Sequence, residues 1–582
     1  MISIAPRHAR PVLLLLALAV LSPARHVCAQ QRPGIVRGPL VTSERWPECT
    51  NLSTWVRDIM RLEGVEHASE TAQAKVLFRW LRLFNRMATG GMIQAFEGEY
   101  GKEEYVTDAH KNLFVYGWGY CDTTSRIAEA VWTEHKKDRS AGERVCVQHA
   151  DGGFHTMYRL RMDGRYGAFD PRYGYYLIET DAPDSRILDW AQVGVDENIL
   201  DNRTFRNRSG PFFEYFGVEW ERALLLEPRY FASESEWVKA GSPVESVFGD
   251  PKYEMGTRFH DMDFELPKGT TIERHWDNTA RRFYVPAGAH TKREEPFRPS
   301  GRFYRVTETM LEGNWPKHDP NYKWARPYLT TVPGDEGYNT GVAGGRTLGQ
   351  AWGRTVYAPD LGAGAPETIE PGSGLVHAAT APHLRAPGAA AASAVFDIRS
   401  PYVLVDGTLS GKLSGGGNDG LAVEIRTLRP KPLDDSEPDR WSQWETVHRG
   451  PGRFSVALGR ERFRADGVSI HGVYRFQIRV STGAAPSRTE PAGLCALRLE
   501  TFFENGIMSI PQIFEGKNTV RFKVEDPSKL RGPVRVIYRY QTAQGEKTHE
   551  QTLRRADFHG NAAAYEIDAP GLVRCNSVSV SY

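Results

Sequence analysis

The sequence predicts an α+β domain in the first third of the chain, followed by β-sandwich domains. Two regions, residues 45–95 and 122–135, have apolar residues at three- and four-residue steps, which is the period of an amphipathic helix. From residue 143 onward the pattern becomes strand-like. Two later blocks, about 394–484 and 490–582, contain alternating stretches at a spacing typical of β-sandwiches.

The length of the chain requires several domains. A single hydrophobic core rarely grows beyond about 250–300 residues, and this chain has 582. Segment 358–393 is rich in Ala, Pro and Gly and lacks apolar periodicity, which is typical of a linker. We therefore expect, in chain order, a signal peptide at 1–29, an α+β domain at 45–240, a β-rich middle region at 245–355, the linker at 358–393, and β-sandwiches at 394–484 and 490–582.

The N-terminus has the features of an export signal. Arg7 and Arg10 precede the apolar run 12–21, which is too short to span a bilayer, and Val27 and Ala29 fit a small-residue cleavage site. No later stretch is apolar enough for a membrane helix. We expect a secreted or periplasmic protein without a membrane span. The formal net charge of +1 gives no sign of a nucleic-acid partner.

The cysteines are informative if the chain is exported, because an oxidising compartment favours disulfides. Removal of the signal peptide leaves an odd number of them: Cys49, Cys121, Cys146, Cys495 and Cys575. The economical pairing joins Cys49 to Cys146 and Cys495 to Cys575. It leaves Cys121 as a free thiol, although other pairings are open.

Three short stretches carry a thiol, an imidazole and a carboxylate in that order: Cys121 in Gly-Tyr-Cys, His155 in Phe-His-Thr and Asp170 in Phe-Asp-Pro. His155 follows Cys121 by 34 residues, and Asp170 follows His155 by 15. A cysteine attacks as the thiolate, which a helix N-terminus and a nearby histidine both favour. Since Cys121 begins a predicted helix, this set of residues points to nucleophilic acyl transfer.

A predicted hairpin relates His155 to Asp170. The strand 154–162 ends at Asp163-Gly164, a strong signal for a two-residue turn. With that turn, the numbers of facing residues add up to 327 (163 + 164). His155 and Asp170 then share one face of the hairpin as diagonal neighbours, whereas a three-residue loop would separate them.

These residues resemble the transglutaminase-like superfamily. Gly-Tyr-Cys-Asp resembles the family's Gly-x-Cys helix start, and Phe-Asp-Pro resembles its Asp-Pro turn. Phe-His-Thr-Met-Tyr resembles its His-Ala-Trp strand, with Thr156 and Met157 where Ala and Trp are usual. The resemblance covers roughly residues 45–215. It implies a papain-like α+β catalytic core.

The resemblance also implies a mechanism. His155 would accept the proton of Cys121, and Asp170 would orient the imidazole. The thiolate would attack a peptide or carboxamide carbonyl of a protein or peptide substrate, and water or an amine would resolve the thioester. The backbone N–H of Cys121 and a donor from Trp118 or Tyr120 would hold the oxyanion. No cofactor is expected.

Other interpretations stay open. The core could be an inactive scaffold in a binding protein whose β domains hold glycan or protein. Cys146, His149 and His155 have a loose metal-ligand spacing without a clear fourth ligand, so we predict no metal. Residues that could stack on a sugar, although core packing is the commoner role, are Trp276, Trp352, Trp441 and Trp444.

Overall fold

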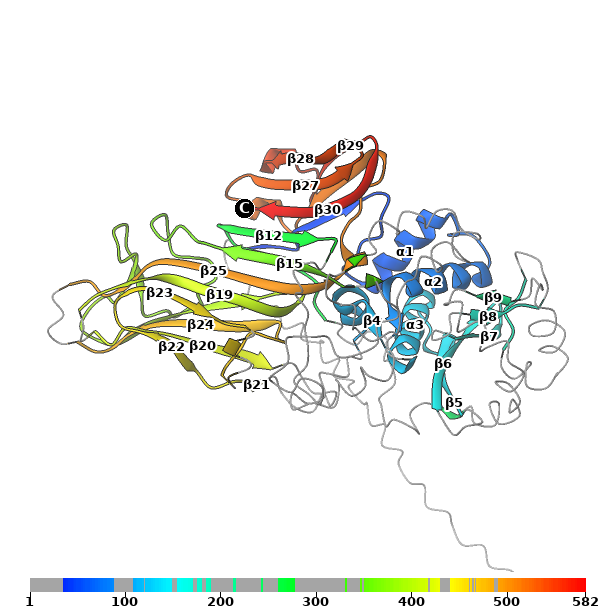
Figure 1. The fold of residues 1–582 in the computed structure, drawn as a ribbon, viewed down its shortest axis with the longest axis horizontal. Helices are drawn as coiled ribbons and strands as arrows, with labels where there is room; N and C mark the ends of the chain where they lie inside the picture. The colour runs from blue at the N-terminus through cyan, green and yellow to red at the C-terminus, as the bar shows by residue number, and fades with distance from the viewer. Residues whose placement is uncertain are drawn as a thin grey trace, which may run out of the picture.

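Strands dominate the fold and form a long β-rich part beside a smaller unit that holds the helices (Figure 1). The computed structural model describes residues 35–87, 108–119, 121–148, 154–170, 175–179, 185–189, 213–215, 242–243, 260–277, 330–331, 346–347, 350–416, 419–429, 440–459, 461–462, 465, 467–485 and 490–582. The predicted signal peptide lies outside these residues.

Three α-helices occur in the described N-terminal part: α1 (Leu52–Glu63), α2 (Glu70–Phe84) and α3 (Cys121–Lys136). Local signals set the bounds of α1. Asn51 accepts a hydrogen bond from the Thr54 amide at 2.8 Å, and Gly64 ends the helix in the left-handed region at φ 67°. Ser69 caps α2 by accepting from the Ala72 amide at 3.3 Å. These helices confirm the apolar periodicity of the sequence.

An antiparallel sheet lies beside the helices, with the strand order β10-β5-β6-β7-β8-β9. Both α2 and α3 contact β6 (Figure 1). A separate parallel pair, β3 with β4, leads into α3. The bounds are β3 (Arg86–Met87), β4 (Trp118–Gly119), β5 (Gly142–Gln148), β6 (Phe154–Met162), β7 (Arg165–Asp170), β8 (Tyr175–Leu177), β9 (Phe213–Tyr215) and β10 (Ser242–Pro243).

The largest sheet has ten strands and gathers segments from distant parts of the chain. Its main order is β16-β17-β25-β15-β12-β30-β27-β28, and β19 pairs with both β25 and β23. The bounds are β12 (Thr270–His275), β15 (Gln350–Tyr357), β16 (Val376–His377), β17 (Leu384–Arg385), β19 (Val403–Ser414), β23 (Gly452–Ala457), β25 (Gly493–Gly506), β27 (Val534–Thr542), β28 (Gly545–Leu553) and β30 (Leu572–Ser581).

Smaller sheets complete the β-rich part. One has the order β18-β24-β20-β21 with β22 beside β20, another has the order β2-β26-β29, and the pairs β1–β11 and β13–β14 stand apart. The bounds are β1 (Val36–Arg37), β2 (Leu40–Ser43), β11 (Glu265–Leu266), β13 (Thr330–Thr331), β14 (Arg346–Thr347), β18 (Ala392–Arg399), β20 (Ala422–Arg429), β21 (Arg440–Trp441), β22 (Glu445–Arg449), β24 (Arg475–Thr482), β26 (Gly516–Lys523) and β29 (Ala562–Ala569).

The predicted fold class, an α+β papain-like core followed by β-sandwich domains, is wrong. The described chain is mostly β with few helices, and it shows no papain-like α+β core. Sheets also cross the predicted domain limits: β2 pairs with β26, and β12 pairs with β30. Apolar periodicity reports which local element forms, but strand pairing across hundreds of residues leaves no local signal.

The Ala/Pro/Gly-rich segment 358–393 does more than link domains. It contains β16 and β17, and β17 pairs with β25 through Leu384 opposite Leu494. Leu384 is buried. Short strands of two residues carry too little periodicity for the sequence to reveal them.

A buried aromatic cluster joins the helices to the β-rich part. The Trp46 ring lies 5.4 Å from Trp80, and the Trp55 ring lies edge-on to Phe84 at 5.1 Å. Trp46 also donates from Nε1 to the Met508 carbonyl at 2.9 Å. Burying one tryptophan removes about 200 Å² from water, which contributes at most about 5 kcal/mol at ~25 cal/mol per Å².

A network of charges crosses the central strands of the ten-stranded sheet around Glu273, whose side chain is nearly buried. Glu273 accepts from Arg354 at 2.7 Å and from Arg539 at 3.1 Å, and the His275 Nε2 lies 3.6 Å away. The His275 imidazole, followed by Arg354, lowers the pKa of Glu273 to about 2. The network therefore ties neighbouring strands together through one ionised carboxylate.

Candidate functional site

Cys121 is the first residue of α3, as the sequence predicts for a nucleophile at a helix start. The preceding chain consists of the π-helical segment η3 (Lys111–Tyr116), Gly117 in the left-handed region at φ 67°, and β4. In the parallel pair before the helix, Gly119 lies opposite Met87. A helix N-terminus favours a negatively charged group. Of the predicted oxyanion donors, Trp118 lies in β4 and Tyr120 lies outside the described residues.

The hairpin of β6 and β7 has the predicted register. Asp163 and Gly164 both have positive φ, at 49° and 79°, as a type I′ turn requires. The facing pairs run from Met162 with Arg165 to Tyr158 with Phe169, so each pair adds up to 327. His155 is the second residue of β6, and Asp170 is the last residue of β7. Continuing the same register puts positions 155 and 170 on one face of the hairpin.

Two hydrogen bonds fix α3 alongside β6. The Ser125 hydroxyl donates to the Thr156 carbonyl at 3.2 Å, and Trp132 Nε1 donates to the Arg161 carbonyl at 3.2 Å. Since the later helix residue meets the later strand residue, the two elements run in the same direction. Cys121 precedes Ser125 by one turn, about 6 Å at ~1.5 Å per residue. The start of α3 is therefore level with the start of β6, where His155 lies.

The alternation of side chains along β6 and β7 limits which of their residues face α3. Glu129 of α3 accepts a hydrogen bond from Arg144 Nε of β5 at 2.9 Å, and Arg144 lies opposite Tyr158. The helix therefore covers the face that carries Tyr158. Strict alternation assigns positions 155 and 170 to the other face of the hairpin. The side chains of Cys121, His155 and Asp170 themselves lie outside what the structure describes. The hairpin brings positions 155 and 170 together, whereas strand alternation alone does not turn them toward α3.

A buried asparagine that sequence analysis missed holds the start of α3. Asn85 ends α2 and accepts from the Thr124 hydroxyl at 3.0 Å. Its side-chain amide donates to the Asn112 carbonyl in η3 at 3.3 Å. Asn85 is completely buried. One side chain thus connects α2, η3 and the first turn of α3, and its only sequence signal is a polar residue directly after an apolar helix.

The predicted disulfides do not form, since Cys49, Cys495 and Cys575 are separate thiols. Cys495 lies in β25 and Cys575 in β30, with β15 and β12 between them in the sheet order. Three strand spacings amount to about 14 Å, far beyond the Cα separation of a disulfide. Cys49 is buried and donates to the Pro47 carbonyl at 3.4 Å. Because the expected disulfides are absent, pairing of the other cysteines no longer identifies Cys121 as the one free thiol.

Arginine and histidine side chains lie against three of the tryptophans considered for sugar binding, and the fourth is buried. Arg426 lies 4.6 Å from the ring of Trp441 and 4.5 Å from that of Trp444. Arg475 lies 5.3 Å from Trp441, and Arg479 lies 4.3 Å from Trp444. Elsewhere, Trp276 is buried and Trp352 stacks on His275 with 4.0 Å between ring centroids. Trp352, Trp441 and Trp444 thus pack against neighbouring side chains while remaining partly exposed.

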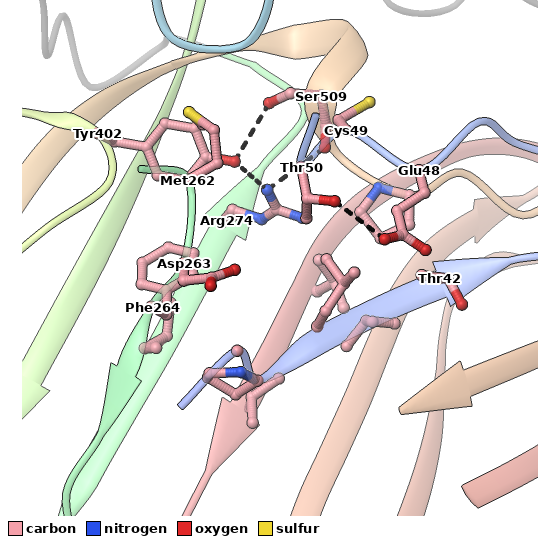
Figure 2. Close-up of a pocket in the computed structure, with 18 of the residues that line it drawn as sticks. Thr42, Glu48, Cys49, Thr50, Met262, Asp263, Phe264, Arg274, Tyr402 and Ser509 are labelled. Carbon is pink, nitrogen blue, oxygen red and sulfur yellow. Dashed lines mark hydrogen bonds between the residues drawn. The ribbon is translucent and has the colours of Figure 1, made fainter. Parts of the chain in front are cut away.

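A pocket with a mostly apolar lining and a few polar groups lies in the β-rich part, between β2, β12 and β30 (Figure 2). Its volume is about 40 Å³. Arg274 reaches into it from β12, and Glu48 and Asp263 contribute carboxylates to its wall. Sequence analysis gave no indication of this site, because its walls come from segments hundreds of residues apart.

Neither a metal cluster nor a membrane-crossing helix occurs in the part of the chain that the structure describes. The side chains of the loose metal-ligand set, Cys146, His149 and His155, lie outside what the structure describes.

No protein-family model and no curated protein sequence matches this chain. Solved structures match at low similarity. A calcium-binding mutant of Bacteroides uniformis β-glucuronidase 2 is 10% identical, with 32% of this chain matching 22% of that chain at a TM-score of 0.12. A putative secreted protein from Parabacteroides distasonis is 8% identical, with 39% matching 80% at 0.16. A Paenibacillus xanthan lyase is 8% identical, with 37% matching 25% at 0.12. Such scores assign neither a fold nor a function.

Proposed function

We propose that this chain is an exported cysteine-dependent enzyme that acts on peptide or carboxamide bonds of a protein or peptide through a thioester. Cys121 is the nucleophile, His155 the base, and Asp170 the carboxylate that orients the imidazole. The motifs that resemble the transglutaminase-like superfamily suggest these roles.

The observation that carries the proposal is the hydrogen bond of Ser125 to the Thr156 carbonyl. It joins the first turns of the helix that begins at Cys121 to the neighbour of His155 in β6. The β6–β7 register supports the pairing of His155 with Asp170 independently. The proposal requires the first residues of β6 to turn His155 toward α3, because regular alternation would direct it away.

The proposed reaction has two stages, formation of the thioester and its resolution. The Cys121 proton passes to His155, the sulfur bonds to the carbonyl carbon, and the C–N bond breaks as the amine leaves with that proton. Water or a second amine then attacks the thioester carbon and gives its proton to His155. The C–S bond breaks, and the Cys121 sulfur leaves and takes that proton back, which restores the free thiol. The backbone N–H of Cys121 is one donor for the oxyanion.

Thiol labelling tests the proposal. Burial raises the pKa of the Cys49 thiol well above its ordinary value, and burial also raises the pKa of Cys495. We expect iodoacetamide at neutral pH to label Cys121 at least about tenfold faster than Cys495, with the rate falling in His155→Ala. Amine incorporation into a glutamine peptide, ammonia release and peptide cleavage then identify the acceptor. Cys495→Ser is the matched control that keeps activity, whereas Cys121→Ser abolishes it.

Equal labelling of Cys121 and Cys495 would count against the enzyme. So would an experimental structure with Cys121 Sγ and the nearest His155 nitrogen more than about 5 Å apart, since catalytic hydrogen bonds are close to 3 Å and run only slightly looser without substrate.

A second proposal is a non-catalytic protein whose β-rich part binds glycan or protein. The pocket at Arg274 favours it, because polar side chains line the pocket and these residues do not include Cys121. Normal ligand binding by Cys121→Ser, together with no activity of the wild-type protein, would support this alternative.

A further inference from the structure

A buried arginine in the β-rich part lacks an ionic partner among the residues that the structure describes. Arg274, in β12, is 8% exposed. Its Nη1 donates to the Tyr402 hydroxyl at 2.6 Å and to the Ser509 carbonyl at 3.4 Å. No described residue accepts from Nε or Nη2. The Nε–Nη2 edge, which is the side that binds a carboxylate with two parallel hydrogen bonds, is therefore open.

This open edge belongs to the side chain that reaches into the pocket (Figure 2). Tyr402 and Ser509 also line the pocket, and their hydrogen bonds to Nη1 fix the orientation of the guanidinium plane. The Tyr402 hydroxyl also lies 3.4 Å from the Ser509 hydroxyl. Arg274 is thus held in one orientation before any ligand arrives, which reduces the entropy cost of binding.

The anionic groups of the pocket do not neutralise Arg274. Glu48 is engaged by Lys523 at 2.7 Å and by the Thr50 hydroxyl at 2.9 Å. Asp263 lies across the pocket and makes no ion pair with Arg274. The Cys49 thiol also lines the pocket, but burial raises its pKa well above the ordinary value, so it stays neutral. For a buried guanidinium without a neighbouring anion, no ionic attraction offsets the free energy of removing the charge from water.

We infer that the pocket binds a small monovalent carboxylate, held by the Nε–Nη2 edge of Arg274. The inference does not depend on Cys121 or on the proposed enzyme activity. Binding supplies the missing counter-charge and fills the two free donor directions with a planar group of matching geometry.

Size and charge favour a monocarboxylate over other anions. The volume is about 40 Å³, and one water needs roughly 10–15 Å³ on the same scale, so the pocket holds a group the size of acetate. Phosphate would bring a second negative charge into a pocket that Glu48 and Asp263 also line. Chloride would use only one of the two parallel donor directions.

Saturation-transfer NMR with acetate and the full-length protein tests this inference. We expect saturable binding with a dissociation constant of about 0.1–10 mM, as is reasonable for so few heavy atoms. Arg274→Gln should weaken binding at least about tenfold, and Arg274→Lys should also weaken it because lysine keeps the charge but loses the fork. Chloride and phosphate at matched ionic strength should not displace acetate.

Controls separate the site from general charge effects. Arg539→Gln removes a partly exposed arginine of β27, which is separated from β12 by β30, and should leave acetate binding unchanged, as should Cys121→Ser. If Arg274→Gln fails to fold, Tyr402→Phe releases Nη1 while keeping the ring, and it should weaken binding. The inference fails if acetate does not saturate, if chloride displaces it equally well, or if folded Arg274 variants bind as wild type does.

The same assay identifies the source of the carboxylate. A methyl glucuronide that displaces acetate points to the acidic sugar of a glycan, and N-acetylalanine that displaces it points to a peptide C-terminus. Displacement by neither identifies the ligand as a free short-chain carboxylate.

Discussion

Replacing Glu129 by Gln removes one half of the ion pair that fixes α3 to β5. The Arg144 Nε lies 2.9 Å from Glu129 Oε2, and the two side chains are only 3% and 8% exposed. Breaking a buried ion pair by removing one partner costs about 3–5 kcal/mol. We therefore expect Glu129→Gln to destabilise the helical unit by roughly that amount.

The same helix provides a matched control. Glu134 pairs with Lys137, whose side chain is 63% exposed, so Glu134→Gln should cost no more than about 1 kcal/mol. Hydrogen exchange of peptides from α3 and β5, with β27 as an internal reference, measures the local free energy of opening. Equal effects of the two variants would refute the reasoning. The double variant Glu129→Leu with Arg144→Met should recover most of the loss, since an apolar pair of similar volume leaves no stranded charge.

Three further changes test other parts of the fold. Asn85→Ala removes two buried hydrogen bonds and should destabilise α3 by about 2–3 kcal/mol in the same exchange assay. Thr124→Val removes only the bond between Asn85 and α3 and should cost less; no cost for Thr124→Val would argue against that bond. The pKa of Glu273 is lowered to about 2, mainly by the His275 imidazole. Its carboxylate therefore stabilises the fold above about pH 4.5 by an amount on the order of 2–3 kcal/mol, and this effect is lost as the pH falls toward 2. The difference in melting temperature between wild type and Glu273→Gln should shrink over that range, and a constant difference would contradict the prediction. Gly506→Ala places a methyl group 3.1 Å from two carbonyl oxygens of η3 and should cost about 1–3 kcal/mol in urea unfolding, whereas Gly364→Ala, with nothing within 4 Å, should stay within about 0.5 kcal/mol.

The parts of the fold that the sequence predicted are those with local causes. The turn Asp163-Gly164 needs two residues that tolerate positive φ, and this chemistry alone sets the register of β6 and β7. The start of α3 at Cys121 likewise follows from apolar periodicity within one segment. Each of these features is decided within about fifteen residues of chain, where pattern and backbone preference act directly.

The parts that the sequence missed depend on contacts between distant segments. No local pattern marks Arg274 as buried, whereas the pairing of β12 with β15 and β30 places it in the interior of a sheet. The expected Cys495–Cys575 disulfide failed for the same reason, because order along the chain says nothing about strand order within a sheet. In segment 358–393 the Ala, Pro and Gly content is typical of a linker, although the segment contains two short strands.

The junction between the helices and the β-rich part has a consequence for the proposed enzyme. The Tyr116 hydroxyl of η3 lies 2.7 Å from that of Tyr474, and Lys111 lies 4.5 Å from the Tyr474 ring. The main chain of η3 also lies against Gly506. Since η3 leads through β4 directly into Cys121, the β-rich part holds the segment that delivers the thiol to the helix start. A catalytic fragment limited to residues 45–240 would lose these contacts, so the start of α3 depends on strands that the sequence assigned to separate domains.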